Sequence, residues 1–184
     1  PALAELRGRL YGEAYTSDAA VGTVCAEWAE RTGLSAGTVV AVGALDAHMG
    51  AVGAGCSEGV LVKILGTSAC DLMVAGNGSR ISAIPGVCGI VDGSVLPGYY
   101  GIEAGQAAVG DLFLWFVNNF APQSLGTAND EKFAALNAQA ALLRPGESGL
   151  LALDWNNGNR CLLEDPRLSG MLLGQTLRTT AAEV

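Results

Sequence analysis

The sequence predicts an α/β fold made of short strands and short helices. Three largely apolar runs, at 38–42, 60–65 and 71–75, have the length and composition of strands. Two longer segments, 105–120 and 130–143, have the composition and apolar spacing of helices. The 26 glycines provide tight turns between these elements.

The first third of the chain predicts a helix, a strand and a second helix. Thr23 is expected to cap a helix over 23–33, and Gly33 to end it. The β-branched run 38–42 predicts a strand that is buried on both faces. The small residues of 47–55 then predict a tightly packed helix.

The middle of the chain predicts mainly strands. The strand at 60–65 stops at a Gly-Thr-Ser turn, and the strand at 71–75 ends in a glycine-rich loop that begins at Gly76. Asp92-Gly93 lies between two apolar triplets, 89–91 and 94–96. An Asp-Gly pair in that position predicts a hairpin with a two-residue turn.

The last third predicts two helices, a short strand and a final helix. The helix at 105–120 is expected to bury its large apolar residues, which are Leu112, Phe113, Trp115 and Phe116. Trp115 and Phe116 suit a subunit interface equally well, so a homodimer stays open. Residues 150–153 predict a short strand, and the chain from 167 onward predicts a loop followed by a helix that the chain end cuts short.

Composition excludes several classes of partner. The net charge of −8 argues against binding to nucleic acid or to an anionic membrane, because both need a basic face. No apolar run reaches the roughly 18 residues that span a bilayer. The five cysteines are scattered without a C-x-x-C pair. This spacing favours reduced thiols in a cytoplasmic protein over disulfides or a zinc site.

Asp46 is the first candidate for chemistry, because it follows the predicted strand 38–42 at the edge where α/β sheets place ligands. A carboxylate at this edge can accept a proton from a substrate hydroxyl. Asp is also among the best residues for capping a helix, and helix-forming residues follow it. Spacing alone leaves both interpretations open.

A turn and a second carboxylate are the other candidates. Gly66, Thr67 and Ser68 form a turn after a predicted strand, where backbone N–H groups and two hydroxyls can bind phosphate oxygens. The motif is short, and the chain has no G-x-x-x-x-G-K-[ST] loop. Glu103 is expected between a strand and a helix start, where it could bind ligand hydroxyls or simply stabilise the helix N-terminus.

The single histidine, His48, does not support a hydrolase or a metal site. A Ser/His/Asp site would use Ser68, but the second glycine of a nucleophile elbow is missing and His48 precedes the serine. One histidine and a few scattered carboxylates are too few ligands for a metal. His48 is therefore expected to be a packed or helix-surface residue.

Five blocks of sequence together resemble the FGGY family of carbohydrate kinases, and within it the ribulokinase group. They occur in the family's order and cover nearly the whole chain. The Asp-Ala-His sequence at 46–48 distinguishes the chain from xylulokinases and glycerol kinases, which tend to have Asp-Asn or Asp-Gln there. The blocks are VGALDAHMGAVGAG at 42–55, KILGTSACD at 63–71, GVCGIVDGS at 86–94, GIEAGQ at 101–106 and LDWNNGNR at 153–160.

The resemblance implies two actin-like (ribonuclease-H-like) domains with a cleft between them. The chain would hold the end of the first, sugar-binding domain at 1–56 and the start of the second, nucleotide-binding domain at 57–184. Asp46 would be the general base, Glu103 would help to hold the sugar, and Gly66, Thr67 and Ser68 would contact the ATP phosphates. Segment 154–160 would support the cleft. The reaction implied is transfer of the γ-phosphoryl group of ATP, with Mg²⁺, to L-ribulose.

Some family features are missing, namely the early Asp-x-Gly-Thr phosphate hairpin, the first-domain sugar wall and the later adenine-binding segment. The isolated chain is therefore expected to have little or no kinase activity. Two alternatives stay open: a kinase for another ketopentose or polyol, and a non-catalytic actin-like module that binds a nucleotide or a partner protein.

Overall fold

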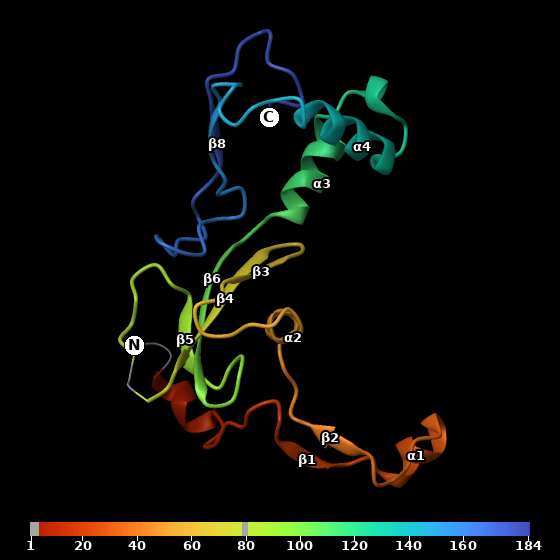
Figure 1. Ribbon diagram of the computed structural model, residues 1–184, viewed down its shortest axis with the longest axis vertical. Helices are drawn as coiled ribbons and strands as arrows, with labels where there is room; N and C mark the ends of the chain where they lie inside the picture. Colours follow the sequence, from red (N-terminus) through yellow and green to blue (C-terminus); the bar gives the residue numbers. More distant parts are fainter. Residues whose placement is uncertain (1–3, 79–80) are drawn as a thin grey trace.

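The computed structural model describes residues 4–78 and 81–184. The chain forms a mixed α/β structure with a four-stranded sheet at its centre (Figure 1). A short arm of two strands and one helix lies at one end, and two helices with a second two-stranded sheet lie at the other (Figure 1). The predicted α/β class is confirmed.

The N-terminal arm differs from its prediction. After the 3₁₀ turn η1 (Ala4–Arg9), strand β1 (Ala20–Thr23) pairs antiparallel with β2 (Val39–Ala41), and α1 (Ala26–Thr32) lies between them in sequence. Thr23 is therefore in a strand, and the residue before α1 is Cys25. Gly33 ends the helix in the left-handed conformation, as expected (φ 74°). β2 is exposed rather than buried, because its only paired neighbour among the described residues is β1.

The central sheet has the strand order β3-β4-β6-β5, and every neighbouring pair is antiparallel. Its strands are β3 (Val62–Leu65), β4 (Ala69–Gly76), β5 (Gly89–Asp92) and β6 (Tyr99–Gln106). The predicted hairpin of 89–91 with 94–96 across a two-residue turn is wrong: β5 pairs antiparallel with β6, and residues 93–98 connect the two strands. Residues 94–96 are not a strand, because Val95 turns into the core, where it is 2% exposed.

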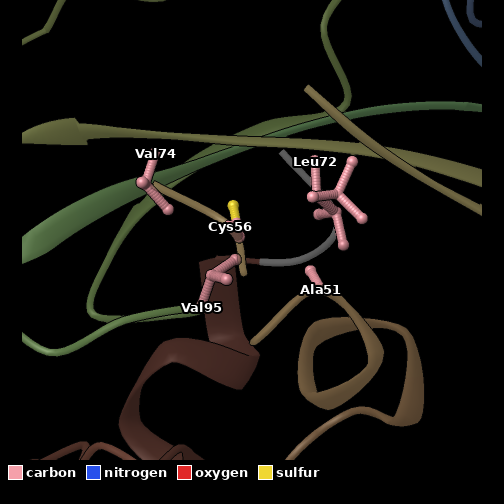
Figure 2. Packing of buried hydrophobic residues seen from close by; sticks show 6 residues of the cluster. Ala51, Cys56, Leu72, Val74 and Val95 are labelled. Carbon is pink, nitrogen blue, oxygen red and sulfur yellow. The ribbon is translucent and has the colours of Figure 1, made fainter. Parts of the chain in front are cut away.

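Helix α2 (Asp46–Gly53) packs against this sheet and closes the main core. The core residues are Ala51, Cys56, Val62, Leu72, Val74 and Val95. Figure 2 shows five of them converging from the helix, the sheet and the connecting segments. The small residues of α2 bring its backbone close to β3: a Cβ added to Gly50 would lie 3.1 Å from Cδ1 of Ile64.

The C-terminal part contains α3 (Gly110–Asn119), the 3₁₀ turn η2 (Gln123–Leu125), α4 (Asn129–Ala140), and strands β7 (Leu151–Leu153) and β8 (Met171–Leu173), which pair antiparallel. The helix expected near the C-terminus is wrong: residues 174–184 form turns and irregular structure. No helix in the described ranges has the length and apolar character required to cross a bilayer.

The predicted core of α3 is only partly correct. Leu112 and Phe116 are half-buried, whereas Phe113 and Trp115 are exposed, and Val117 is the buried residue of this helix. The helical spacing of these residues is as predicted. Phe113 and Trp115 lack packing partners because α4 covers one side of α3 and the other side opens onto a groove.

Candidate functional site

Asp46 is the first residue of α2, and its side chain is exposed. Leu45 occupies the N-cap position and makes no side-chain cap. One oxygen of the Asp46 carboxylate, Oδ1, accepts the N–H of Ala47 at 2.8 Å. No lysine, arginine or histidine of the described residues forms an ion pair with it. The carboxylate thus takes up one helix N–H while its second oxygen stays open to solvent.

The Gly66-Thr67-Ser68 turn joins β3 to β4, on the sheet that carries α2. The start of α3 holds it in place, because Val109 and Gly110 donate their N–H groups to the carbonyls of Thr67 and Gly66, both at 2.9 Å. The approach is close: a Cβ at Gly110 would lie 2.6 Å from the Gly66 carbonyl oxygen. The carbonyls of Gly66 and Thr67 therefore face the start of α3.

Fewer of the hydrogen-bond donors of this turn than of its carbonyls have a partner within the protein. Only the Gly66 N–H is bonded within the turn, to the Ser68 carbonyl at 2.9 Å. Among the described residues, the N–H groups and hydroxyls of Thr67 and Ser68 make no hydrogen bond. Thr67 is exposed and Ser68 is half-buried. Two backbone N–H groups and two hydroxyls within three residues suit the binding of phosphate oxygens.

Glu103 lies in the middle of β6, so the expected position between a strand and a helix is wrong. Both oxygens of its carboxylate have partners. Oε2 is 3.2 Å from Nε2 of His48, and Oε1 is paired with Nη2 of Arg160. Glu103 thereby connects α2 with the loop before β8.

His48 is buried, which agrees with the first of its two expected placements, a packed or a helix-surface residue, and it also makes polar contacts. Its Nδ1 is 2.8 Å from the carbonyl oxygen of Ser94, and its Nε2 faces Glu103. Each ring nitrogen thus faces an oxygen atom, so the imidazole is held from two sides. Since His48 is two residues after Asp46, these contacts fix the turn of helix that carries Asp46.

Arg160 completes this network, and its contact with Glu103 was not predicted from the sequence. Burial lowers the pKa of Arg160, but its hydrogen bond to Cys70 and the nearby carboxylate of Glu103 raise the pKa above its usual range overall. The sequence placed Arg160 only in a supporting block. A single cation in that block was the only hint of an ion pair, and its partner Glu103 is 57 positions away in the sequence.

Two pockets lie away from the predicted residues. One, of about 400 Å³, is lined by Cys88, Asn157, Asn159, Arg160 and Glu164 among others. The other, of about 860 Å³, is an apolar groove between α3, α4 and residues 170–184. Asp46, Glu103 and the Gly66-Thr67-Ser68 turn line neither of them. The structure links the predicted residues through α2 and the sheet rather than through one enclosed cavity.

Comparison with known families settles the chain's membership. Residues 61–184 match the model of the FGGY family of carbohydrate kinases, C-terminal domain. The chain belongs to the FGGY family. The resemblance seen in the sequence blocks is therefore confirmed.

Curated relatives of this FGGY chain include proteins named ribulokinase. One from Shouchella clausii is 43% identical over 190 residues, which cover 100% of this chain and 33% of the relative. Another, from Mycolicibacterium smegmatis, is 44% identical and covers 89% of this chain and 30% of the relative. The chain thus spans about a third of the length of these relatives.

Solved structures of the family have the same fold. The crystal structure of xylulose kinase from Rhodospirillum rubrum superposes with a TM-score of 0.72 at 27% identity, covering 92% of this chain and 32% of that one. Gluconate kinase from Lactobacillus acidophilus superposes with a TM-score of 0.66 at 18% identity, and covers the same shares. The actin-like fold expected from the resemblance is confirmed. The roles of Asp46, Glu103 and the turn stay predictions.

Proposed function

We propose that the full-length protein containing this chain phosphorylates L-ribulose with ATP, giving L-ribulose 5-phosphate and ADP. The observation that carries the proposal is the exposed carboxylate of Asp46, held on a helix that packs beside β3. β3 leads directly into the Gly66-Thr67-Ser68 turn, in which the N–H groups of Thr67 and Ser68 have no acceptor among the described residues. The ribulokinase names of several relatives support the choice of sugar.

Asp46 acts as the general base in this proposal. Its open oxygen accepts the proton of the sugar hydroxyl as the hydroxyl oxygen attacks the γ-phosphorus and ADP leaves. The bond from Ala47 N–H to Oδ1 orients the carboxylate, and the buried His48 holds the first turn of α2 in place. The proton therefore has a defined acceptor whose position is set by the fold.

The Gly66-Thr67-Ser68 turn binds the ATP phosphates in this proposal. The N–H groups of Thr67 and Ser68 and their hydroxyls point to no acceptor among the described residues, which fits a cradle for anionic oxygens. ATP would supply the phosphoryl group, and Mg²⁺ bound with it would neutralise the developing charge. Kinase sites typically bind Mg²⁺ through one or two carboxylates and the substrate phosphates, so a preformed cluster of ligands is not needed.

Glu103 holds the sugar in this proposal, in addition to its contacts within the protein. A carboxylate offers about four lone-pair positions, so its bonds to His48 and Arg160 leave room for a ligand hydroxyl. We also propose that the first, sugar-binding domain ends near residue 56 and the second begins near 57. That boundary separates α2 from β3, although the two share the core.

The test measures ADP release by the full-length protein with L-ribulose and MgATP, comparing wild type with Asp46→Asn. Loss of a general base is expected to lower kcat by on the order of a hundred- to ten-thousand-fold, with sugar binding largely kept. Asp130→Asn is the matched control, because Asp130 is also an exposed acid in the first turn of a helix. Its kcat is expected to be unchanged.

Other outcomes redirect the proposal. If L-ribulose is inert while another ketopentose or polyol is phosphorylated, the kinase assignment stands and the sugar is wrong. If Asp46→Asn is as active as wild type, Asp46 only stabilises the helix N-terminus and the proposed mechanism is wrong. If no sugar is phosphorylated and nucleotide still binds, the non-catalytic actin-like module becomes the better hypothesis.

A further inference from the structure

Two cysteines that are far apart in sequence meet beside the Arg160 network. The Sγ atoms of Cys88 and Cys161 are 2.8 Å apart, and both residues are free thiols. Cys88 directly precedes β5, and Cys161 follows Arg160. A covalent S–S bond is about 2.05 Å long, so a small approach of the two sulfurs closes it.

The backbone holds the two segments together independently of the thiols. Leu162 donates its N–H to the carbonyl of Gly86 at 3.2 Å. A Cβ added to Gly86 would lie 3.0 Å from the Leu162 Cα, so the segments touch at a point where only glycine fits. Leu162 itself has a positive φ of 72°, which is uncommon for a residue other than glycine. The nearness of the sulfurs is thus built into the chain path.

The surroundings give the two sulfurs different roles. The N–H of Gly105 donates to Cys161 Sγ at 3.0 Å, so this sulfur acts as an acceptor. Partial desolvation of the Cys88 sulfur by its neighbours, together with Cys161, raises the pKa of Cys88 to about 11 against the opposing effect of Arg160. Cys88 therefore keeps its proton near neutral pH and can donate it toward Cys161.

A small oxidant can reach Cys88 from solvent, and the half-buried Cys161 lies directly beside it. Cys88 is exposed, and it lines the pocket of about 400 Å³ together with the adjacent Arg160. Reversible oxidation needs a sulfur with thiolate character, access from solvent and a second cysteine beside it. Here Cys161 is the sulfur that accepts a hydrogen bond, and Cys88 provides the access. The other three cysteines have no cysteine partner among the described residues.

We propose that Cys88 and Cys161 form a reversible oxidation site for hydrogen peroxide. Cys161 releases its proton to solvent as its sulfur attacks one peroxide oxygen, the O–O bond breaks, and the departing hydroxide takes up a proton from solvent and leaves as water, giving a sulfenic acid on Cys161. The Cys88 sulfur then attacks the Cys161 sulfur and displaces the hydroxyl, which leaves as water with the Cys88 proton. The sum is two thiols and one peroxide giving one disulfide and two waters. A dithiol reductant reverses the change.

The test uses the full-length protein, which is treated with hydrogen peroxide, alkylated with N-ethylmaleimide and digested with trypsin without reduction. Trypsin separates the five cysteines of this chain onto five different peptides. The expected product is a disulfide between the peptide of residues 81–132, which contains Cys88, and that of 161–167, which contains Cys161. It disappears with dithiothreitol, while Cys25, Cys56 and Cys70 remain alkylated.

Substitutions check the order of the steps. Cys88→Ser and Cys161→Ser both abolish the linked peptide, whereas Cys25→Ser, at another exposed cysteine, leaves it unchanged. In Cys88→Ser the sulfenic acid is trapped by dimedone on Cys161. In Cys161→Ser, trapping on Cys88 is expected to be roughly tenfold weaker or less, because the protonated thiol is a poor nucleophile.

Two results would overturn the proposal. One is the absence of the linked peptide from oxidised wild type, a measurement that needs no variant and so does not depend on whether the variants fold. The other is an equal yield of the linked peptide when the protein is oxidised in urea, because the native fold then makes no contribution. Neither result bears on the kinase assay.

Discussion

The central sheet and the C-terminal part of the chain are similarly apolar in sequence but differ in how much they bury. Around the sheet, α2 and the segments on either side enclose six buried residues (Figure 2). In the C-terminal part, Val117 and Leu136 are buried, while large side chains such as Phe113, Trp115 and Leu151 are 60%, 49% and 67% exposed. The strands β7 and β8 pair only with each other among the described residues.

The difference shows that an apolar segment is buried only where a second layer of structure packs against it. β4 and β6 each have a neighbour on both sides, and α2 covers the sheet, so their apolar residues meet partners. β7 and β8 have no second sheet layer within the described chain, and α3 and α4 leave the groove beside them open. A hydrophobic stripe needs a facing element before it adds stability.

The largest expected effect on stability comes from making the same substitution, leucine to alanine, in both regions. Leu72 is 0% exposed at the centre of the sheet core, and Leu151 is 67% exposed on β7. Leu72→Ala should lower the free energy of unfolding by about 2–5 kcal/mol, since it leaves a cavity. Leu151→Ala should stay within about 0.5 kcal/mol of wild type. Denaturant unfolding of the two variants and the wild type measures both.

Equal losses for these two variants would break the comparison. They would mean that Leu151 is covered in the folded protein by something outside the described contacts. A loss at Leu72 below that at Leu151 would contradict the assignment of the core itself.

The next effect concerns the junction between the two regions. Gly110 begins α3, and an added Cβ would lie 2.6 Å from the Gly66 carbonyl oxygen, a rigid backbone atom. Gly110→Ala should therefore destabilise the protein by about 1–3 kcal/mol. It should also raise the KM for ATP, because the proposed phosphate turn is displaced.

Gly53→Ala is the matched control for Gly110. An added Cβ at Gly53, at the end of α2, meets no atom within 4 Å. This substitution should stabilise the protein by about 0.4–1 kcal/mol, because alanine restricts the unfolded chain. Thermal unfolding of the pair gives opposite signs; the same sign for both would show that α3 does not rest on the turn.

The sequence predicted those elements of the fold that depend on local pattern. The ranges 60–65, 71–75 and 130–143 correspond closely to β3, β4 and α4, because apolar runs and spacing are properties of neighbouring residues. The exposure of β2 and the absence of a helix after 173 were not predictable in this way. Both depend on which distant segments lie nearby, and a pattern within one segment carries no such information.

The candidate site divides in the same manner. Asp46 and the Gly66-Thr67-Ser68 turn were identified from motifs, and the structure leaves their proposed roles possible. The contacts of Glu103 were not predictable, because its partners His48 and Arg160 are 55 and 57 positions away. The sheet register places Glu103 of β6 within reach of His48 on α2, and the spacing of residues within one segment does not predict such a contact.

The smallest expected effect lies in the C-terminal region, at the start of α4. Glu131 accepts hydrogen bonds from the N–H groups of Thr127 at 2.8 Å and Ala128 at 3.2 Å, and these bonds hold its pKa below the usual range. A lowered pKa in the folded state adds stability above the unfolded pKa, and this stability is lost as pH falls through the folded pKa. Glu131→Gln should thus be slightly less stable than wild type at neutral pH, and the difference should vanish in acid. Urea unfolding of both proteins across that pH range checks it; a difference that persists unchanged in acid would show that the charge of Glu131 does not hold the start of α4.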